Sequence, residues 1–447
     1  MDVPLLDPAD HERPILRTSA GVVSAGRLRA DIERLAATFP EGAHVINLCE
    51  RRDQFLLAYC AALAAGRTSL MPPSRAPQAV REIESLYAGS HRCDDETVAR
   101  VLALPSSADR ARGAAAAGLS VPAAHAVQVA FTSGSTGVPR AHVKRWSTLL
   151  GSTRHNAARI RDCLAPRYGA ARPWIVATVP AQHMYGTETT ILLPIAADMA
   201  VHAGRPLFPA DVAAALAQVP QPRVLVTTPV HLRALAGSSQ RFPEVGVVVC
   251  ATAPLDAPLA CEIERALGTP VLEMFGSTET CVIATRLAAH EQSWRTYPGV
   301  TLTPGVDGTL VDAPWFAAPT RLQDVIECPG PQRFIVRGRN ADLIEVAGKR
   351  ASLADLTRRL LAIPGVTDAV VFQPEPDGTG AVHRVAALVV APGLDAEAVS
   401  ARLALGVDPA FLPRPMLLVP ALPRNELGKL TRAELLACAA AHRTAGH

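Results

Sequence analysis

Short apolar runs alternate with amphipathic stretches along most of the chain. Residues 26–39 carry apolar side chains at helical spacing behind Ser24, a good N-cap residue, and this pattern predicts a surface helix with one buried stripe. Residues 43–49 are short and apolar, as in a buried strand, and residues 51–66 follow as a helix that ends at a glycine. A strand followed by a helix is the beginning of an α/β unit.

The same alternation continues through the middle of the chain. Strands are predicted at residues 126–131, 174–180, 223–229, 245–251 and 270–276. Helices are predicted between them at residues 210–219 and 256–267. Strands that alternate with helices in this way predict a largely parallel sheet covered by helices, the α/β class.

Beyond Arg339 the elements become shorter and more closely spaced. A helix at 353–363, strands at 367–372 and 383–391, and a helix at 395–405 are predicted. About a hundred residues is a normal size for a separate α+β domain. We therefore predict a large N-terminal domain over residues 1–338 and a small, mobile C-terminal domain over residues 339–447, with the boundary near 338–342.

Composition and charge narrow the class of protein. The chain has 447 residues, of which 49% are hydrophobic and 19% charged, as in an ordinary globular enzyme. Lys and Arg (44) nearly balance Asp and Glu (41), so the net charge of +3 does not favour nucleic-acid binding. Nine scattered cysteines without metal-site spacing predict reduced thiols. Without a signal segment or a long apolar run, we expect a soluble cytoplasmic protein that does not associate with membranes.

A segment rich in serine and glycine follows the strand predicted at 126–131. Glycines let the backbone approach an anion, and consecutive N–H groups beside hydroxyls can hold phosphate oxygens. The candidate phosphate-binding residues are Thr132, Ser133, Gly134, Ser135, Thr136 and Gly137. No lysine follows the second glycine, so this is not the loop of P-loop NTPases. An ordinary flexible loop is the alternative.

Three further segments carry residues suited to nucleotide chemistry. Glu279 follows the strand predicted at 270–276, at the edge of the sheet where a carboxylate can hold Mg²⁺ together with phosphates; the alternative is that it caps a helix. Asp324 suits ribose hydroxyls and Arg339 suits phosphate or ribose oxygens. Lys429 follows a glycine near the C-terminus. Taken singly, the last three residues could be ordinary solvated charges.

These four segments, in this order, resemble the adenylate-forming superfamily of acyl- and aryl-CoA synthetases, peptide-synthetase adenylation domains and luciferases. The resemblance runs from the strand and helix near residue 43 to Arg432. Lys144 and Trp146, with the segment 182–188 (QHMYGTE), are similar to short bacterial AMP-ligases of aryl-polyene and xanthomonadin-type pigment pathways. That likeness implies a hydroxybenzoate-type acid and an acyl carrier protein as partner, and a fatty acid is the alternative substrate.

The resemblance implies a role for each matching residue. Thr132 to Gly137 would hold the β- and γ-phosphates of ATP, Thr278 would lie beside the α-phosphate, Glu279 would bind Mg²⁺, and Lys429 would be the catalytic lysine that bridges the acid and the α-phosphate. Asp324 and Arg339 would bind ribose, while Phe275, Ala251, Thr252 and Ala253 would surround adenine. His183, Met184, Tyr185 and Gly186 would form the acid pocket. Coenzyme A or a carrier-protein phosphopantetheine would accept the acyl group.

Some positions depart from the family pattern. Arg140 stands where the phosphate loop commonly has lysine, and Ala341 occupies the usual hinge position. The stretch between Glu279 and Asp324 is short, which predicts trimmed peripheral strands. Two alternatives therefore stay open beside an AMP-forming acid:thiol ligase. One is a non-catalytic module that binds an acyl carrier protein or acyl-adenylate, and the other is an enzyme that stops at the adenylate.

Overall fold

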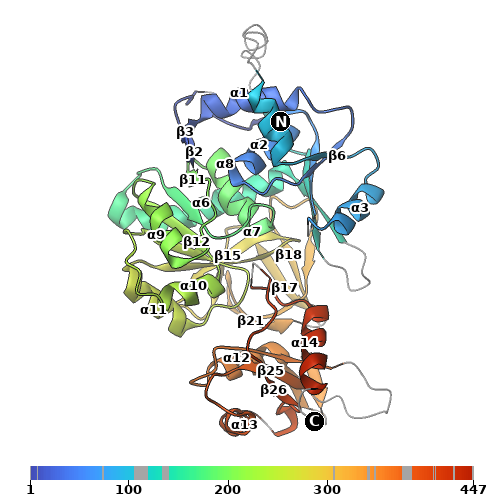
Figure 1. Ribbon diagram of the computed structural model, residues 1–447, viewed down its shortest axis with the longest axis vertical. Helices are drawn as coiled ribbons and strands as arrows, with labels where there is room; N and C mark the ends of the chain where they lie inside the picture. Colours follow the sequence, from blue (N-terminus) through green and yellow to red (C-terminus); the bar gives the residue numbers. More distant parts are fainter. Residues whose placement is uncertain are drawn as a thin grey trace. The chain divides into compact units, whose positions relative to one another are not determined.

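The chain forms two compact units, which are described separately. The computed structural model describes residues 2–7, 9–72, 75–104, 119–132, 140–305, 308–339, 343–346, 349–374, 385–405, 407, 409–425 and 428–444. The first unit comprises Met1–Val300 and Asp312–Thr320, and the second comprises Thr301–Val311 and Arg321–His447. The boundary predicted near 338–342 lies within the second unit, and as a hinge it stays a prediction. A large unit rich in sheet and a smaller α+β unit confirm the predicted fold class (Figure 1).

The larger sheet of the first unit runs in the order β16-β15-β14-β13-β12-β10-β11-β2-β3. Its strands are β2 (Pro14–Thr18), β3 (Gly21–Ser24), β10 (Trp174–Ala177), β11 (Ala200–His202), β12 (Arg223–Thr227), β13 (Val247–Cys250), β14 (Val271–Ser277), β15 (Cys281–Leu287) and β16 (Trp294–Thr296). The strands from β14 to β2 are parallel, as predicted, while β15, β16 and β3 are antiparallel to their neighbours.

Helices cover this sheet. The helices α9 (Pro209–Ala217), α10 (Pro229–Ala236) and α11 (Ala257–Leu267) pack their apolar stripes onto β10, β12 and β13 in one continuous core. The long helix α6 (Trp146–Tyr168) contacts β13 and β15. Short helical turns follow β10, namely α7 (Met184–Thr187), the π-helical turn Glu188–Leu192 and α8 (Leu193–Ala196).

A second sheet has the order β6-β4-β5-β8-β9. Its strands are β4 (His44–Asn47), β5 (Thr68–Met71), β6 (His91–Cys93), β8 (Ala126–Thr132) and β9 (Arg140–Arg145), with only β9 antiparallel to its neighbour. Helix α2 (Arg52–Ala64) is buried on nearly all sides. Tyr59 in α2 donates to Gln128 of β8 at 3.3 Å, and Arg52 donates to the carbonyls of Ala177 and Val179 at the end of β10. Helix α2 therefore ties the two sheets together.

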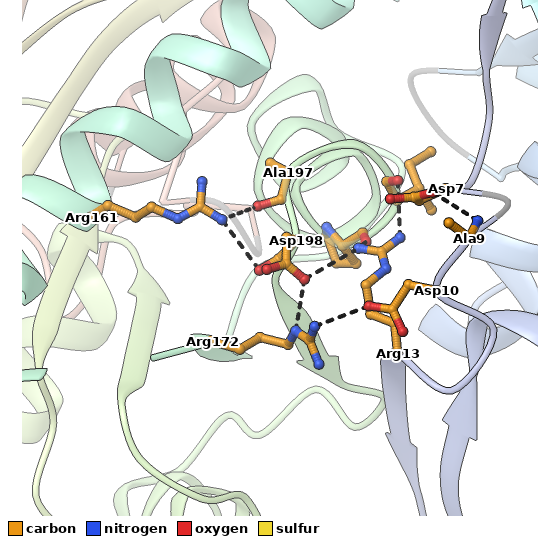
Figure 2. Close-up of polar contacts among 10 residues, drawn as sticks. Asp7, Ala9, Asp10, Arg13, Arg161, Arg172, Ala197 and Asp198 are labelled. Carbon is orange, nitrogen blue, oxygen red and sulfur yellow. Dashed lines mark hydrogen bonds and ion pairs between the residues drawn. The ribbon is translucent and has the colours of Figure 1, made fainter. Parts of the chain in front are cut away.

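Arginines from the N-terminal segment and from α6 bind backbone carbonyls at the end of α8 (Figure 2). Arg13, only 4% exposed, donates to the carbonyls of Pro194 and Ile195 at 3.0 and 3.3 Å. Arg161 donates to the carbonyls of Ala197 and Asp198, the residues that follow the helix. The last carbonyls of a helix have no partner within the helix, so the guanidinium of Arg13 satisfies two of them.

The remaining elements of the first unit lie around these sheets. They are β1 (Asp2–Pro4), α1 (Ala25–Ala36), α3 (Pro77–Leu86), α4 (Asp95–Ala103) and β7 (Ser120–Pro122). Ser24 caps α1 as predicted, because its side chain accepts from the backbone N–H of Arg27 at 3.4 Å. Within the described part of the chain, none of the helices has the length and apolar character that crossing a bilayer requires.

The second unit is built on a small sheet with a core on each face. The strands β24 (Asp368–Phe372), β25 (Ala386–Val390) and β26 (Met416–Leu418) form this sheet, with α12 (Leu353–Leu361), α13 (Ala396–Ala404) and α14 (Arg432–Thr444) around it (Figure 1). Alternate residues of β25 face opposite cores: Ala387 and Val389 pack with α12 and α13, and Ala386 and Leu388 pack with α14. The other strands are β17 (Thr301–Gly305), β18 (Gly308–Asp312), β19 (Thr320–Leu322), β20 (Asp324–Gly330), β21 (Arg333–Arg339), β22 (Leu343–Val346) and β23 (Lys349–Ser352).

Candidate active site

The start of the predicted phosphate loop lies beside the predicted metal carboxylate. Thr132 ends β8, and its hydroxyl is 2.9 Å from Nε2 of His142 in β9. The same Nε2 is 3.7 Å from Oε1 of Glu279. Two motifs that are far apart in the sequence therefore meet through one histidine. The predicted residues Ser133, Gly134, Ser135, Thr136 and Gly137 lie outside the described residues.

Glu279 lies in a tight turn between β14 and β15. The hydroxyl of Ser277 accepts from the backbone N–H groups of Glu279 and Thr280, at 3.1 and 3.2 Å. A β-carbon on Gly276 would lie 2.2 Å from the carbonyl oxygen of Cys281, so only glycine fits where this hairpin begins. Because a strand follows the turn, the alternative that Glu279 caps a helix is wrong.

The surroundings of Glu279 keep its carboxylate charged. Burial alone would raise the pKa of Glu279, but hydrogen bonding at Ser277 and the nearby His142 and Lys144 lower it below its ordinary value. Burial lowers the pKa of His142, so this imidazole is neutral at pH 7. The Glu279 side chain is 30% exposed and can therefore reach a ligand.

The chemistry of these groups fits a magnesium ion that is held mainly by a nucleotide. Among the described residues, no three His, Cys, Asp or Glu side chains gather closely enough to bind a metal by themselves. Mg²⁺ commonly takes one or two carboxylates and leaves its other positions to phosphates and water. Glu279 supplies such a carboxylate, and the hydroxyl of Thr132 is a second oxygen nearby.

The predicted adenine-side loop follows β13 and has a strained backbone. Thr252 has φ = +86°, a conformation that a β-branched residue rarely adopts. Glu273 of β14 accepts from the backbone N–H of Leu255 at 3.2 Å, and Arg286 of β15 donates to the carbonyl of Leu255 at 3.2 Å. Glu273 and Arg286 also form an ion pair at 2.6 Å. This pair therefore holds both backbone groups of Leu255, at the end of the loop Ala251–Leu255.

The predicted adenine-stacking ring belongs to the same network. The ring of Phe275 lies 5.2 Å from the ring of Trp294, measured between centroids. The guanidinium of Arg286 lies over Trp294, 4.6 Å from its centroid. Phe275 is partly exposed, while Thr278 lies half-buried in the turn that follows. The loop, the ring and the turn thus share one scaffold at the carboxyl ends of β13 and β14.

The segment predicted to form the acid pocket is firmly anchored. His183 immediately precedes α7 and is half-buried. Gln128 donates to the sulfur of Met184 at 3.6 Å, and the Tyr185 hydroxyl donates to the carbonyl of Val249 at 3.0 Å. A β-carbon on Gly186 would lie 1.9 Å from the carbonyl oxygen of Pro180, so the turn requires glycine there. These contacts hold the segment beside β8 and β13, and its role in binding an acid stays a prediction.

The two residues predicted to bind ribose are neighbours in the second unit. Asp324 of β20 and Arg339 of β21 are directly opposite each other in an antiparallel pair. The hydroxyl of Thr309 donates to the carbonyl of Asp324 at 2.8 Å. The backbone therefore brings together two positions that were predicted separately.

Hydrogen bonds hold the backbone of Lys429 in the second unit. Its backbone N–H donates to the side-chain oxygen of Asn425 at 2.9 Å, and its carbonyl accepts from the N–H of Asn425 at 2.8 Å. Arg424 binds both carboxylate oxygens of Asp368 at 2.7 Å and donates to the carbonyl of Gly428 at 3.0 Å. The Lys429 residue is exposed. The backbone at residues 428–429 is thus held by contacts with Asn425 and Arg424.

Several residues that support this site were not predicted from the sequence, His142 and Glu273 among them. His142 reaches Glu279, and Glu273 reaches Leu255 beside the predicted loop, only when strands distant in the chain pack together. The available signal was weak: each is a polar residue within a strand, His142 in the segment 140–145 and Glu273 within an otherwise apolar run.

Similarity to known proteins was found at the levels of family, sequence and fold. The family model described as AMP-binding enzyme matches residues 69–315. A 4-coumarate–CoA ligase of Rhodobacter capsulatus is 33% identical over 305 residues, which are 67% of this chain and 73% of that protein.

Solved structures share the fold. The o-succinylbenzoate CoA synthetase MenE from Bacillus subtilis, in complex with the acyl-adenylate intermediate OSB-AMP, matches with a TM-score of 0.81 at 18% identity, covering 97% of this chain and 98% of that chain. The same synthetase with ATP and a magnesium ion matches with a TM-score of 0.78 at 19% identity, covering 97% of this chain and 100% of that chain.

Proposed function

Because this chain belongs to the family of AMP-binding enzymes and is an ATP-dependent, AMP-forming acid:thiol ligase, we propose that its substrate is an aryl carboxylic acid of hydroxybenzoate type. Two comparisons support this class of acid. The 4-coumarate–CoA ligase of Rhodobacter capsulatus and the o-succinylbenzoate CoA synthetase of Bacillus subtilis both act, by name, on acids that carry an aromatic ring. A fatty acid is the alternative substrate.

The observation that carries the proposed nucleotide site is that the two phosphate-side motifs meet at one histidine. Thr132 and Glu279 lie on either side of His142, at 2.9 and 3.7 Å from its Nε2. A hydroxyl at the start of a phosphate loop and a charged carboxylate are the groups needed where a magnesium nucleotide binds. We assign Glu279 to Mg²⁺ and Thr132 to the β- and γ-phosphates, together with residues 133–137.

In the first half-reaction, the acid carboxylate attacks the α-phosphorus of ATP and pyrophosphate leaves. Both reactants are anions, so their repulsion must be offset in the transition state. We assign this role to the ammonium of Lys429, with Thr278 beside the α-phosphate. When bound, Mg²⁺ neutralises part of the phosphate charge.

We assign the base and the sugar of the nucleoside to separate sets of residues. We assign adenine to Phe275 and to Ala251, Thr252 and Ala253, since the loop and the ring share the Glu273–Arg286 scaffold. We assign the ribose hydroxyls to Asp324 and Arg339, which are cross-strand neighbours.

In the second half-reaction, a thiol attacks the acyl-adenylate, a thioester forms and AMP leaves. We propose that this thiol is the phosphopantetheine of an acyl carrier protein, as the likeness to pigment-pathway ligases implies, with coenzyme A as the alternative. We assign the acid to the segment His183 to Gly186. We also propose a cytoplasmic location, which is supported by the absence of disulfides among the nine cysteines, all of them described.

The proposal is tested by measuring pyrophosphate release over a panel of acids. Benzoates, hydroxybenzoates, cinnamates, fatty acids and amino acids are each supplied with ATP and Mg²⁺. Release confined to the aryl acids supports the proposal, and release confined to fatty or amino acids contradicts it. Binding of ATP without release for any acid would favour the non-catalytic module.

A further inference from the structure

Two oppositely charged side chains are buried beside the turn that carries Glu279. Lys144 of β9 is 3% exposed, and Glu188, the first residue of the π-helical turn, is 1% exposed. The proposed reaction uses neither of them. Buried charges are costly unless specific partners compensate for the lost hydration, so their partners indicate what they do.

Lys144 holds one end of the turn. Its ammonium donates to the backbone carbonyl of Glu279 itself. The strand β9 fixes its origin, because Lys144 pairs with Gln128 of β8 in the sheet. At 3% exposure the ammonium is not available to a nucleotide in solution, so it acts on Glu279 through the backbone.

Glu188 holds the other end. Both of its carboxylate oxygens lie 3.2 Å from the backbone N–H of Val282, three residues after Glu279. One of these oxygens also accepts from Ser152 at 2.6 Å and from Asn156 at 3.2 Å. Asn156 is in turn fixed by the hydroxyl of Tyr297, at 2.6 Å. These donors and the nearby Lys144 favour the ionised carboxylate against burial, which raises the pKa of Glu188.

One of the two residues between these ends has a strained backbone. Cys281 is fully buried and has φ = +62°, in the left-handed region that favours glycine. Such conformations persist where the surrounding structure over-determines them, and they cluster at functional sites. Here the Lys144 ammonium donates to the carbonyl of Glu279 on one side of Cys281. The Glu188 carboxylate accepts from the N–H of Val282 on the other side.

We propose that Lys144 and Glu188 are positioning residues that clamp the turn from Glu279 to Val282 and so fix the carboxylate that binds the magnesium nucleotide. This inference rests on the proposed role of Glu279. It adds a reason why the lysine of segment 140–146 and the glutamate of segment 182–188 occur together in this chain: they act on opposite ends of one turn.

The test compares single and double substitutions by calorimetry. ATP binding to the whole chain is measured with and without Mg²⁺ for wild type, Lys144→Met, Glu188→Gln and the double variant, with Glu279→Gln as the reference for a lost ligand. We expect Lys144→Met to weaken the magnesium-dependent part of ATP affinity by about tenfold, because residues that orient a metal ligand commonly have effects of this size. Its ATP affinity without Mg²⁺ should be kept. Glu188→Gln should also weaken the magnesium-dependent part. The double variant should lose less than the product of the two single losses, since both act on one turn.

A matched control separates positioning from plain stability. Arg13 is also a buried cation that donates to backbone carbonyls in the same unit, but it lies in the N-terminal cluster of Figure 2. Arg13→Met should lower Tm and leave magnesium-dependent ATP binding unchanged. If Lys144→Met and Glu188→Gln behave as Arg13→Met does, the clamp is refuted. Should Lys144→Met fail to fold, the nearly isosteric Glu188→Gln decides alone.

The same data distinguish failure of the clamp from failure of the proposed function. If wild type binds ATP with the help of Mg²⁺ but releases no pyrophosphate with any acid, the proposed function fails. The effect of the clamp variants on magnesium-dependent ATP affinity can still be measured in that case. If Mg²⁺ has no effect on ATP binding by wild type, Glu279 has no metal role and the clamp proposal fails with it.

Discussion

Thr252, in the predicted adenine-side loop, and Cys281, two residues after Glu279, both have positive φ angles. Each lies next to a segment that is held by buried ionic groups: Leu255 by Glu273 and Arg286, and Val282 by Glu188. Strain of this kind needs compensation from surrounding contacts. At the scale of single residues, the chain therefore uses its buried charges to fix backbone that would otherwise relax.

Lys429→Ala should separate the two half-reactions. Removing one preorganised positive group from a transition state commonly lowers the rate by about 10² to 10³, so adenylation should fall by this amount. Thioester formation from supplied acyl-adenylate should fall much less, because pyrophosphate has already left. Both rates are measured separately by rapid quench, and equal losses in the two half-reactions would remove Lys429 from its assigned role.

Glu273 should make stability depend on pH. Burial raises the pKa of Glu273 to about 7, against an ordinary value of 4.5, even though Arg286 opposes the shift. The folded state therefore keeps a proton that the unfolded state loses, so this group's contribution to stability falls as pH rises from about 4.5 to about 7. In Glu273→Gln, which cannot ionise, this contribution is absent.

Thermal unfolding of wild type and Glu273→Gln across this pH range checks the prediction. Because the variant also loses an ion pair, the informative quantity is the change in the Tm difference with pH and not its value at one pH. The Tm of wild type relative to the variant should fall as pH rises. A Tm difference that is constant from pH 4.5 to 7, or one that changes in the opposite direction, would show that Glu273 has no raised pKa.

At the scale of elements, an ion pair joins the loop that carries Lys429 to the strand β24. Arg424 joins the loop to β24 through both carboxylate oxygens of Asp368. We predict that Arg424→Ala slows adenylation by about 10- to 100-fold, because small misplacements of a catalytic group are costly. Arg402→Ala is the matched control, since Arg402 is an exposed arginine of the same unit that donates to the carbonyl of Pro364.

Both arginine variants are assayed for adenylation and for Tm. Arg402→Ala should keep the adenylation rate of wild type. If Arg424→Ala lowers Tm and leaves the rate intact, the anchor serves folding alone and does not position Lys429.

The local pattern of apolar residues was sufficient to predict most of these elements. It was not sufficient to predict which distant strands pair. The apolar runs that became β4, β10, β12 and β13 and the stripe of α1 are confirmed, with ends shifted by a few residues. The conformation of the turn that carries Glu279 was ambiguous in the sequence. A serine side chain that accepts from the N–H groups two and three residues later, as Ser277 does here, also occurs where a helix begins. The contact of Thr132 and Glu279 through His142 depends on the packing of two different sheets, which no local periodicity encodes.

At the scale of the whole molecule, family membership confirms the resemblance inferred from the four motifs. The likeness to pigment-pathway ligases stays a prediction, as do the acid and the carrier protein. The predicted site residues belong to two compact units, with Glu279 and Phe275 in the first and Asp324 and Lys429 in the second.

The product balance tests the central claim most directly. With a hydroxybenzoate, ATP, Mg²⁺ and a phosphopantetheine thiol, the enzyme should form one AMP, one pyrophosphate and one thioester for each ATP consumed, and no AMP when the acid is left out. Formation of ADP and phosphate, or ATP cleavage that does not depend on the acid, would contradict an AMP-forming acid:thiol ligase.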